Sequence, residues 1–302
     1  MLLPELAKLS DVRFRGIVTG SGVTAATVGR KYGFDWCASS IDELLNDDET
    51  DVVFIVTRHS QHADMITRAL AAGKAVFCEK PLAVDWEQLR SVVEALQTHG
   101  GPLSIGYNRR FSAFAHRMKT HFDGCGALRA IYRVNAGTIP HDHWLSDPAE
   151  GGRIIGEACH FVDFFNALTG SLPVSVSVDM PADADIRNET QAVVRYEDSS
   201  VLQLTYAVNG PAGWSKERIE VFGGGKGAVI EDFRVLELID DDGRRTKTKL
   251  RKMDKGHGTM LAAWMEAVRR GEFLISIDDL VATTRTTFAM AGMSDRPSPD
   301  AQ

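Results

Sequence analysis

Apolar residues follow two different periods in the two halves of the chain. Residues 51–57 (DVVFIVT) and 74–78 are mainly apolar runs, typical of strands buried on both faces of a parallel sheet. Between and around them, helical spacing of apolar residues predicts amphipathic helices. Strands are predicted over 14–18, 51–57, 74–78 and 102–107, and helices over 23–32, 41–45, 61–72 and 85–99. This alternation predicts that residues 1–108 form a doubly wound, Rossmann-like α/β nucleotide-binding domain.

Period-two alternation then dominates residues 109–302, which predicts an α+β domain with a mostly antiparallel open sheet. Its strands are predicted over 129–135, 174–178, 191–196, 201–207, 218–222 and 228–231. After a helix over 111–122, three helices over 153–168, 259–270 and 279–293 are expected to cover one face of this sheet. An open sheet with an uncovered face favours a homo-oligomer, a dimer or tetramer, packed through this second domain.

Composition narrows the class of partner. The 302 residues carry a net charge of -7 without a compensating basic run, which argues against a nucleic-acid partner and leaves a small-molecule substrate. Four separated cysteines form no C-x-x-C motif, so a reducing cytoplasm is expected. No apolar run reaches membrane-spanning length, and the first residues lack the pattern of a signal peptide.

Candidate chemistry follows the predicted parallel strands. The strand at 74–78 runs directly into Glu79, Lys80 and Pro81. Ligands bind at the carboxyl ends of strands in such sheets, so Lys80 is expected at a cleft, and Pro81 ends the strand because it cannot donate to a ladder. Two further sets of polar residues follow the strands at 51–57 and 102–107: Thr57, His59 and His62 after the first, and Asn108 and Arg109 after the second.

The phosphate-binding turn of a doubly wound domain is missing. Residues 1–9 are predicted to be the tail of the helix that normally follows the first strand and its G-x-G-x-x-G turn. The glycine cluster at 223–227 lies between two predicted strands and is interpreted as a β-turn. Three explanations are open: the natural protein starts upstream, the strand at 14–18 pairs directly with that at 51–57, or another chain fills the position.

Several motifs in order resemble one family. They are residues 57–62 (TRHSQH), 79–82 (EKPL), 106–111 (GYNRRF) and 151–163 (GGRIIGEACHFVD). They are similar to motifs of the glucose-fructose oxidoreductase, inositol dehydrogenase and MocA (Gfo/Idh/MocA) family of nicotinamide-dependent oxidoreductases. The chain most resembles the oxidoreductase half of two-part bacterial proteins whose other half looks like a zinc alcohol dehydrogenase, and residues 135–144 resemble the pattern of those proteins.

The resemblance implies hydride transfer between NAD or NADP and a hydroxyl-bearing carbon, often of a sugar or cyclitol. It implies that Lys80 polarises the substrate hydroxyl and that His160 is the acid/base, a role suited to an imidazole. The expected substrate-binding residues are Asn108, Arg109, His143, Trp144, Glu157 and Asp163. The expected cofactor-binding residues are Thr57, His59, His62, Glu79, Lys80 and Pro81.

Two positions depart from the family pattern. Many members carry an aspartate four residues before the histidine, where this chain has Gly156, and the nearby acid is Glu157. Residues 18–21 are small and neutral where an acid would grip the adenosine ribose, which relaxes the preference for NAD over NADP.

Plainer interpretations stand beside these. His160 could be a helix histidine with satisfied hydrogen bonds, and His62 is expected to cap its helix rather than to touch a cofactor. The pattern of His141, Asp142 and His143 suggests a metal site. Such a site needs three or four convergent ligands, so no metal is predicted. The alternative function is a non-catalytic ligand-binding or assembly module that has lost dinucleotide binding.

Overall fold

The first domain is an α/β unit, as predicted. The computed structural model describes residues 2–20, 22–140, 142–180 and 185–294. The elements of the first domain are α1 (Leu2–Leu6), β1 (Gly16–Val18), α2 (Gly22–Tyr32), β2 (Trp36–Ala38), α3 (Ile41–Leu45), β3 (Val52–Ile55), α4 (His62–Ala71), β4 (Ala75–Cys78), α5 (Trp86–His99) and β5 (Leu103–Ile105). Ser40 caps α3 as its residue type predicts, because its hydroxyl accepts a hydrogen bond from the Asp42 N–H.

The parallel strands of this domain form two separate sheets. β1 pairs with β2, and β3, β4 and β5 form a second sheet in that order. The expectation that the first predicted strand might pair directly with the strand at 51–57 is therefore wrong. In the usual doubly wound order one strand lies between these two positions, so β1 and β3 each turn an edge towards the same gap.

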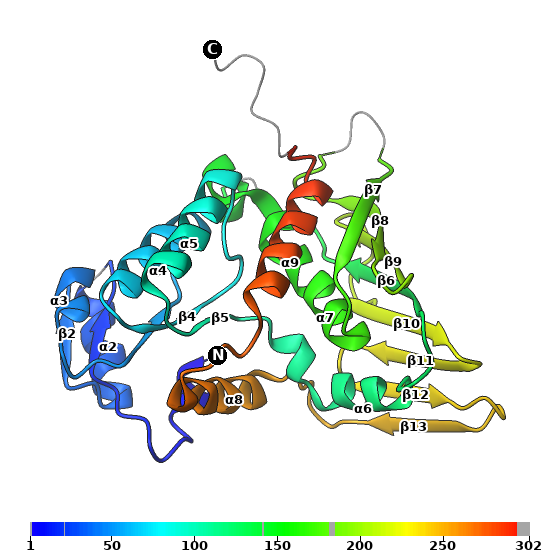
Figure 1. Ribbon diagram of the computed structural model, residues 1–302, viewed down its shortest axis with the longest axis horizontal. Helices are drawn as coiled ribbons and strands as arrows, with labels where there is room; N and C mark the ends of the chain where they lie inside the picture. Colours follow the sequence, from blue (N-terminus) through cyan, green and yellow to red (C-terminus); the bar gives the residue numbers. More distant parts are fainter. Residues whose placement is uncertain (1, 21, 141, 181–184, 295–302) are drawn as a thin grey trace, which may run out of the picture.

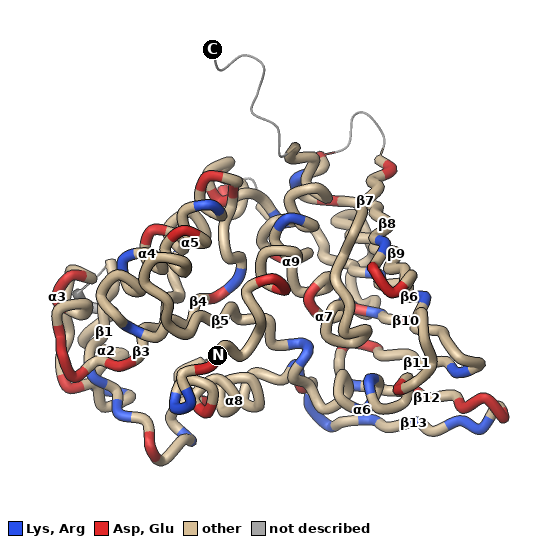
Figure 2. The backbone as a smooth tube through the Cα atoms, in the orientation of Figure 1, with Lys and Arg blue, Asp and Glu red and all other residues tan. Residues whose placement is uncertain are grey.

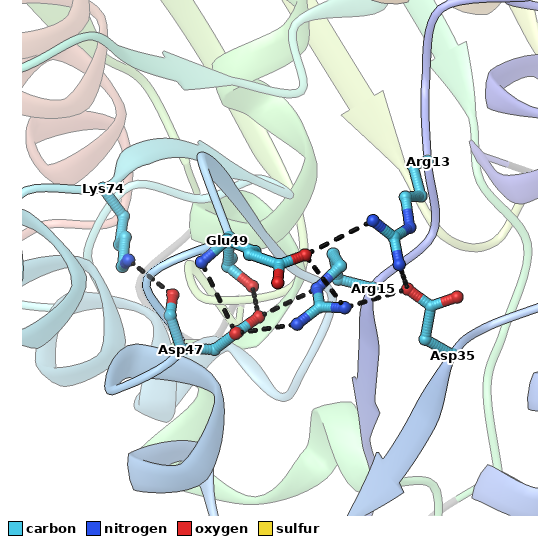
Figure 3. Close-up of polar contacts among 7 residues, drawn as sticks. Arg13, Arg15, Asp35, Asp47, Glu49 and Lys74 are labelled. Carbon is cyan, nitrogen blue, oxygen red and sulfur yellow. Dashed lines mark hydrogen bonds and ion pairs between the residues drawn. The ribbon is translucent and has the colours of Figure 1, made fainter.

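Charged side chains tie the two sheets together at one end of the gap (Figure 3). Arg15, just before β1, donates to Asp47 from Nε at 3.1 Å and from Nη2 at 2.9 Å, and from Nη1 to Asp35 at 3.1 Å. The Thr50 hydroxyl donates to Asp47 at 2.6 Å, and Lys74 donates to the Asp47 carbonyl oxygen at 2.9 Å. The bonds from Arg15 and then from Thr50 hold the pKa of Asp47 well below its ordinary value. Since Asp47 precedes β3, they connect the amino ends of β1 and β3.

The second domain is built on an eight-stranded sheet. The strands are β6 (Arg129–Asn135), β7 (Pro173–Val178), β8 (Thr190–Tyr196), β9 (Val201–Ala207), β10 (Glu217–Gly223), β11 (Lys226–Glu231), β12 (Val235–Ile239) and β13 (Arg245–Lys249). Their order is β13-β12-β11-β10-β6-β9-β8-β7, and only β6 with β9 is a parallel pair. The mostly antiparallel sheet is thus confirmed. The glycine cluster at 223–227 is a β-turn, as interpreted: Gly224 and Gly225 connect β10 to β11, and Gly223 pairs with Lys226. The sequence patterns do not predict β12, β13 or the short β2.

Two helices cover the inner face of this sheet (Figure 1). They are α7 (Cys159–Thr169) and α9 (Ile277–Met290), which pack on each other, and α9 also packs on β7. Aromatic rings fill the space beneath α7: Phe161 lies 4.6 Å from Tyr132, and Phe165 lies 5.0 Å from Tyr196, measured between ring centroids. The predicted helix at 153–168 differs at its start, because residues Ile154–Ala158 form a π-helical turn. Such turns are frequent at functional sites.

The helix predicted over 259–270 lies elsewhere than expected. This helix, α8 (His257–Arg270), packs on α1 rather than on the eight-stranded sheet. Its apolar side chains Met260, Leu261 and Trp264 form one buried cluster with Leu2 and Phe77. Figure 1 shows α8 below β4 and β5, opposite α4 and α5. The late part of the chain therefore supplies a layer of the first domain.

Short one-turn helices complete the connections: η1 (His59–Gln61), η2 (Asn108–Phe111), η3 (Trp144–Ser146) and η4 (Pro148–Glu150), with α6 (Ala113–His121) after η2. Basic and acidic segments alternate over both domains, and the turn between β12 and β13 carries both signs (Figure 2). None of the helices in the described ranges is long and apolar enough to cross a membrane.

Candidate functional site

A cleft of about 1440 Å³ begins in the gap between β1 and β3 and extends to the second domain. At the gap its walls are apolar and include Ile17, Val18, Val53 and Ile55. Its other end is polar and is lined by Thr57, Glu79, Lys80, Asn108, Arg109, Glu157, His160, Lys216, Lys255 and His257. The cleft therefore collects seven of the predicted site residues from segments far apart in the sequence.

Lys80 reaches this cleft because the buried strand β4 ends two residues before it. All four residues of β4 are buried, and the following peptide bond, to Pro81, is cis. The Lys80 ammonium group donates to the carbonyl oxygen of Gly156 at 2.6 Å. Among the described residues no carboxylate lies within ion-pair distance of it. Lys80 thus connects the end of β4 with the π-helical turn of the second domain while keeping its charge unpaired.

His160 enters the same cleft from the first turn of α7. The residue is buried, and its Nδ1 atom has no hydrogen-bond partner. Burial holds the pKa of His160 well below its ordinary value, and the nearby charges of Arg109 and Lys80 act in the same direction. Burial and these charges therefore keep the imidazole neutral.

The glycine at the position of the family aspartate has a structural explanation. A Cβ atom on Gly156 would lie 2.6 Å from Cε1 of His59, which is a steric clash. His59 is buried there, with its Nδ1 3.0 Å from the Glu150 carbonyl oxygen. Burial is the main cause that lowers the pKa of His59 to about 4. The imidazole of His59 and a side chain at position 156 therefore exclude each other.

Glu157 is the acid that remains on this wall of the cleft. The Lys216 ammonium group lies 3.3 Å from its carboxylate. Burial acts to raise the pKa of Glu157, but Lys216, Lys80 and Arg153 outweigh burial and keep it below the ordinary value. Glu157 is therefore an ionised hydrogen-bond acceptor facing the cleft.

A buried ionic network positions Arg109 beside His160. Arg109 donates to both carboxylate oxygens of Glu217 at 2.8 Å, and the Tyr132 hydroxyl donates to the same carboxylate at 2.6 Å. Lys255 donates to it as well. Burial acts to raise the pKa of Glu217, but these cations hold it well below its ordinary value. Glu217 thus joins η2, β6, β10 and the segment before α8.

Other predicted residues lie away from the cleft lining. His62 places Nδ1 2.7 Å from the Pro81 carbonyl oxygen and Nε2 3.3 Å from that of Thr57, and it makes no side-chain capping bond in α4. Buried Asp163 faces Arg110 at 2.7 Å, and burial raises its pKa to about 7.

Two further predicted residues cluster near η1. The Trp144 ring packs edge-on against His59 at 4.8 Å, and the Nδ1 atom of His143 accepts from the Leu145 N–H at 3.2 Å. His141, considered as a metal ligand with His143, lies outside the described residues. In the described ranges no three His, Cys, Asp or Glu side chains converge in a way that could hold a metal ion. The substrate and cofactor roles assigned to these residues stay predictions.

Sequence reasoning missed Lys216, Lys255 and His257. These residues line the cleft but lie in the segments before β10 and α8, without a motif around them. Only the tertiary structure, which brings these residues to the cleft, identifies them as candidate site residues.

A parallel α/β domain with a polar cleft at its strand ends, facing a sheet domain, defines a nucleotide-dependent enzyme class. Residues 2–107 match the model described as "Oxidoreductase family, NAD-binding Rossmann fold", and residues 125–229 match the GFO/IDH/MocA C-terminal domain. The chain belongs to the Gfo/Idh/MocA family of oxidoreductases. The predicted family, fold class and nicotinamide cofactor, NAD or NADP, are thereby confirmed. The narrower resemblance to one half of a two-part protein stays a prediction.

Relatives and solved structures agree with this assignment. Inositol 2-dehydrogenase of Rhizobium meliloti (strain 1021) is 28% identical over 249 residues, which are 78% of this chain and 73% of that protein. The scyllo-inositol 2-dehydrogenase (NAD(+)) of Bacillus subtilis (strain 168) is 32% identical over 158 residues, 51% of this chain and 45% of that protein. Levoglucosan dehydrogenase, in complex with NADH and levoglucosan, has the same fold with a TM-score of 0.77, 18% identity, and coverage of 96% of this chain and 90% of that one.

The cleft fits a nicotinamide cofactor at one end. Thr57, Glu79 and Lys80 lie at the carboxyl ends of β3 and β4, and His160 presents a neutral ring to the same space. The opposite end, between β1 and β3, has apolar walls with charged residues such as Arg15 and Glu49 beside them. The fit is therefore carried by the polar end of the cleft.

Proposed function

We propose that this protein transfers a hydride between NAD or NADP and a hydroxyl-bearing carbon of a sugar-like or polyol substrate. The observation that carries the proposal is that Lys80 and His160, one from each domain, line one cleft. A small-molecule substrate is supported by the dehydrogenases among the relatives. The alternative of a non-catalytic module gains no support from them.

The two side chains divide the chemistry of alcohol oxidation between them. When bound, the nicotinamide ring takes up the hydride. His160 is neutral because of its burial and its cationic neighbours, so it can accept the proton of the substrate hydroxyl. The Lys80 ammonium group stabilises alkoxide character at the same oxygen and holds the hydroxyl in place. In the reverse direction the protonated imidazole returns the proton.

The neighbouring residues orient the reactants. Asn108 donates from its side-chain amide to the Lys255 carbonyl oxygen at 2.8 Å, so η2 is attached to the segment before α8. Glu157 offers a carboxylate that can accept from a substrate hydroxyl. Thr57 and Glu79, at the ends of β3 and β4, would hold the cofactor. His59, His62 and Pro81 support this surface from behind through the contacts described above.

The first measurement is a fluorescence titration with NADH and NADPH, followed by turnover of inositols and aldoses. Replacing Lys80 or His160 by Ala should lower turnover by about 10²-fold or more, because positioned acid/base groups contribute that much. The matched control is Lys247→Ala in β13, whose side chain is 66% exposed. Absence of saturable nucleotide binding, with no turnover by either the unmodified protein or Lys80→Ala, would favour the binding-module alternative.

We also propose that the protein forms a homo-oligomer through the outer face of the eight-stranded sheet. This face is not covered by α7 or α9, and Ile131 and Phe222 are 44% and 48% exposed on it. Ile131→Lys should shift the mass measured by light scattering towards the monomer. A monomer for the unmodified protein would refute the proposal.

The free state of all four cysteines supports a reducing compartment, for which we propose the cytoplasm.

A further inference from the structure

The polar end of the cleft holds more cations than carboxylates on the second-domain side. Lys216, Lys255 and Arg109 line it directly, and His160 lines the same end. Lys216 is the most accessible, with 44% of its side chain exposed, whereas the Lys255 side chain is 18% exposed. This concentration of positive charge stands in a chain whose net charge is -7.

Each carboxylate on this side is shared between cations. The Glu217 carboxylate forms ion pairs with both Arg109 and Lys255, and it accepts a hydrogen bond from the Tyr132 hydroxyl. Glu157 has Lys216 at 3.3 Å, and it is also the carboxylate that feels the charge of Lys80. The neutralisation of the cleft cations is therefore incomplete. On the first-domain side, Glu79 adds a carboxyl group in which burial raises the pKa and favours the neutral form.

A fifth cation lies just behind the lining. Arg153 is buried at 4% exposure, and it donates to the carbonyl oxygens of Ala136 and Gly137. Its Nε atom has no hydrogen-bond partner, and within the described ranges no carboxylate lies at ion-pair distance. The guanidinium group packs over the ring of Tyr206 at 5.4 Å. Its charge adds to the potential of the cleft, and the carboxylate that it stabilises there is Glu157, which Lys216 and Lys80 also stabilise.

Unpaired charge of one sign in a partly enclosed cleft focuses the field and attracts ligands of opposite sign. The same potential contributes to the neutral state of His160. An anionic group placed among these cations would gain charge-assisted hydrogen bonds. We propose that the substrate of the reaction carries a carboxylate or a phosphate, and that Lys216 and Lys255 bind this group beside His160. The inference rests on the proposed hydride transfer and adds the chemical class of its substrate.

The phosphates of the dinucleotide are the other possible source of an anion. They belong with the first domain, at the carboxyl ends of its parallel strands. Lys216 and Lys255 come from segments that precede β10 and α8. Substituting Lys216 therefore separates the two sources, because only a substrate anion should depend on it when NADH affinity is measured in the same preparation.

The test compares matched pairs of sugars that differ in charge: galactose with galacturonate, and glucose with glucose 6-phosphate. We expect kcat/KM to be higher for the charged member of at least one pair. Lys216→Met should lower that value by about 10-fold or more while leaving the neutral sugar and the Kd of NADH unchanged. Lys247→Met in β13, a lysine that does not line the cleft and is 66% exposed, is the matched control and should leave both members of each pair unchanged.

The outcomes separate the two claims. Turnover of the neutral sugars alone, or equal effects of Lys216→Met on both members of a pair, would overturn the anionic substrate and leave hydride transfer standing. If no sugar is turned over, calorimetric binding of galacturonate and glucose 6-phosphate decides. Binding that depends on Lys216 would retain the anion site and count against hydride transfer. Absence of such binding would overturn the anion site as well. Loss of NADH affinity in Lys216→Met would assign the cations to the cofactor.

Discussion

Removing the carboxylate of Glu217 should destabilise the protein more than any other single charge change in the sheet domain. Glu217 is 0% exposed and accepts from Arg109, Tyr132 and Lys255. Glu217→Ala would leave the buried guanidinium of Arg109 without its partner. Breaking a buried pair from one side costs about 3–5 kcal/mol, because an uncompensated charge remains. This is a large share of the roughly 5–15 kcal/mol that stabilises a typical folded protein.

Urea unfolding monitored by tryptophan fluorescence measures the effect. The matched control is Glu220→Ala in the same strand, since the Glu220 carboxylate pairs with Arg218 at 2.7 Å but is 30% exposed. Exposed pairs contribute about 0–1 kcal/mol, so this variant should unfold close to the unmodified protein. Equal unfolding midpoints for Glu217→Ala and Glu220→Ala would refute the reasoning. A double variant, Arg109→Met with Glu217→Leu, should recover part of the loss, because no buried charge is then left unpaired at these two positions.

Other substitutions test the contact between His59 and the π-helical turn. Gly156→Ala should cost about 1–3 kcal/mol by overpacking against His59, and combining it with His59→Ala should cost less than the sum, as a double-mutant cycle would show. Strict additivity would contradict the contact. His59 has a pKa of about 4 in the folded state against an ordinary 6.5. The stability it contributes is complete above pH 6.5 and is lost as the pH falls towards 4, by up to about 3 kcal/mol. His59→Gln should flatten the fall in the free energy of unfolding over that range, and an unchanged slope would exclude His59 as its cause.

The sequence by itself determined most of the helices and strands, and it determined which polar residues follow the parallel strands. The apolar runs at 51–57 and 74–78 predict buried strands of a parallel sheet, and Lys80 lies two residues after the second of them. Period-two alternation marked the sheet domain in the same way. These features depend on residues close in sequence, whose spacing decides which side of an element is apolar. The motifs around Lys80 and His160 added the family.

The tertiary structure alone decided which surfaces meet. The apolar stripe of α8 predicts that one face of the helix is buried, but it does not show which element covers that face. In the structure this face packs on α1 and not on the eight-stranded sheet. The pairing of Arg109 with Glu217 joins residues 108 positions apart, and the exclusion of a side chain at Gly156 comes from His59. No sequence motif surrounds Lys216 or Lys255. Their role as site residues depends on the other charged groups that folding brings to the same cleft. Long-range contacts of this kind leave no periodicity for sequence reasoning to detect.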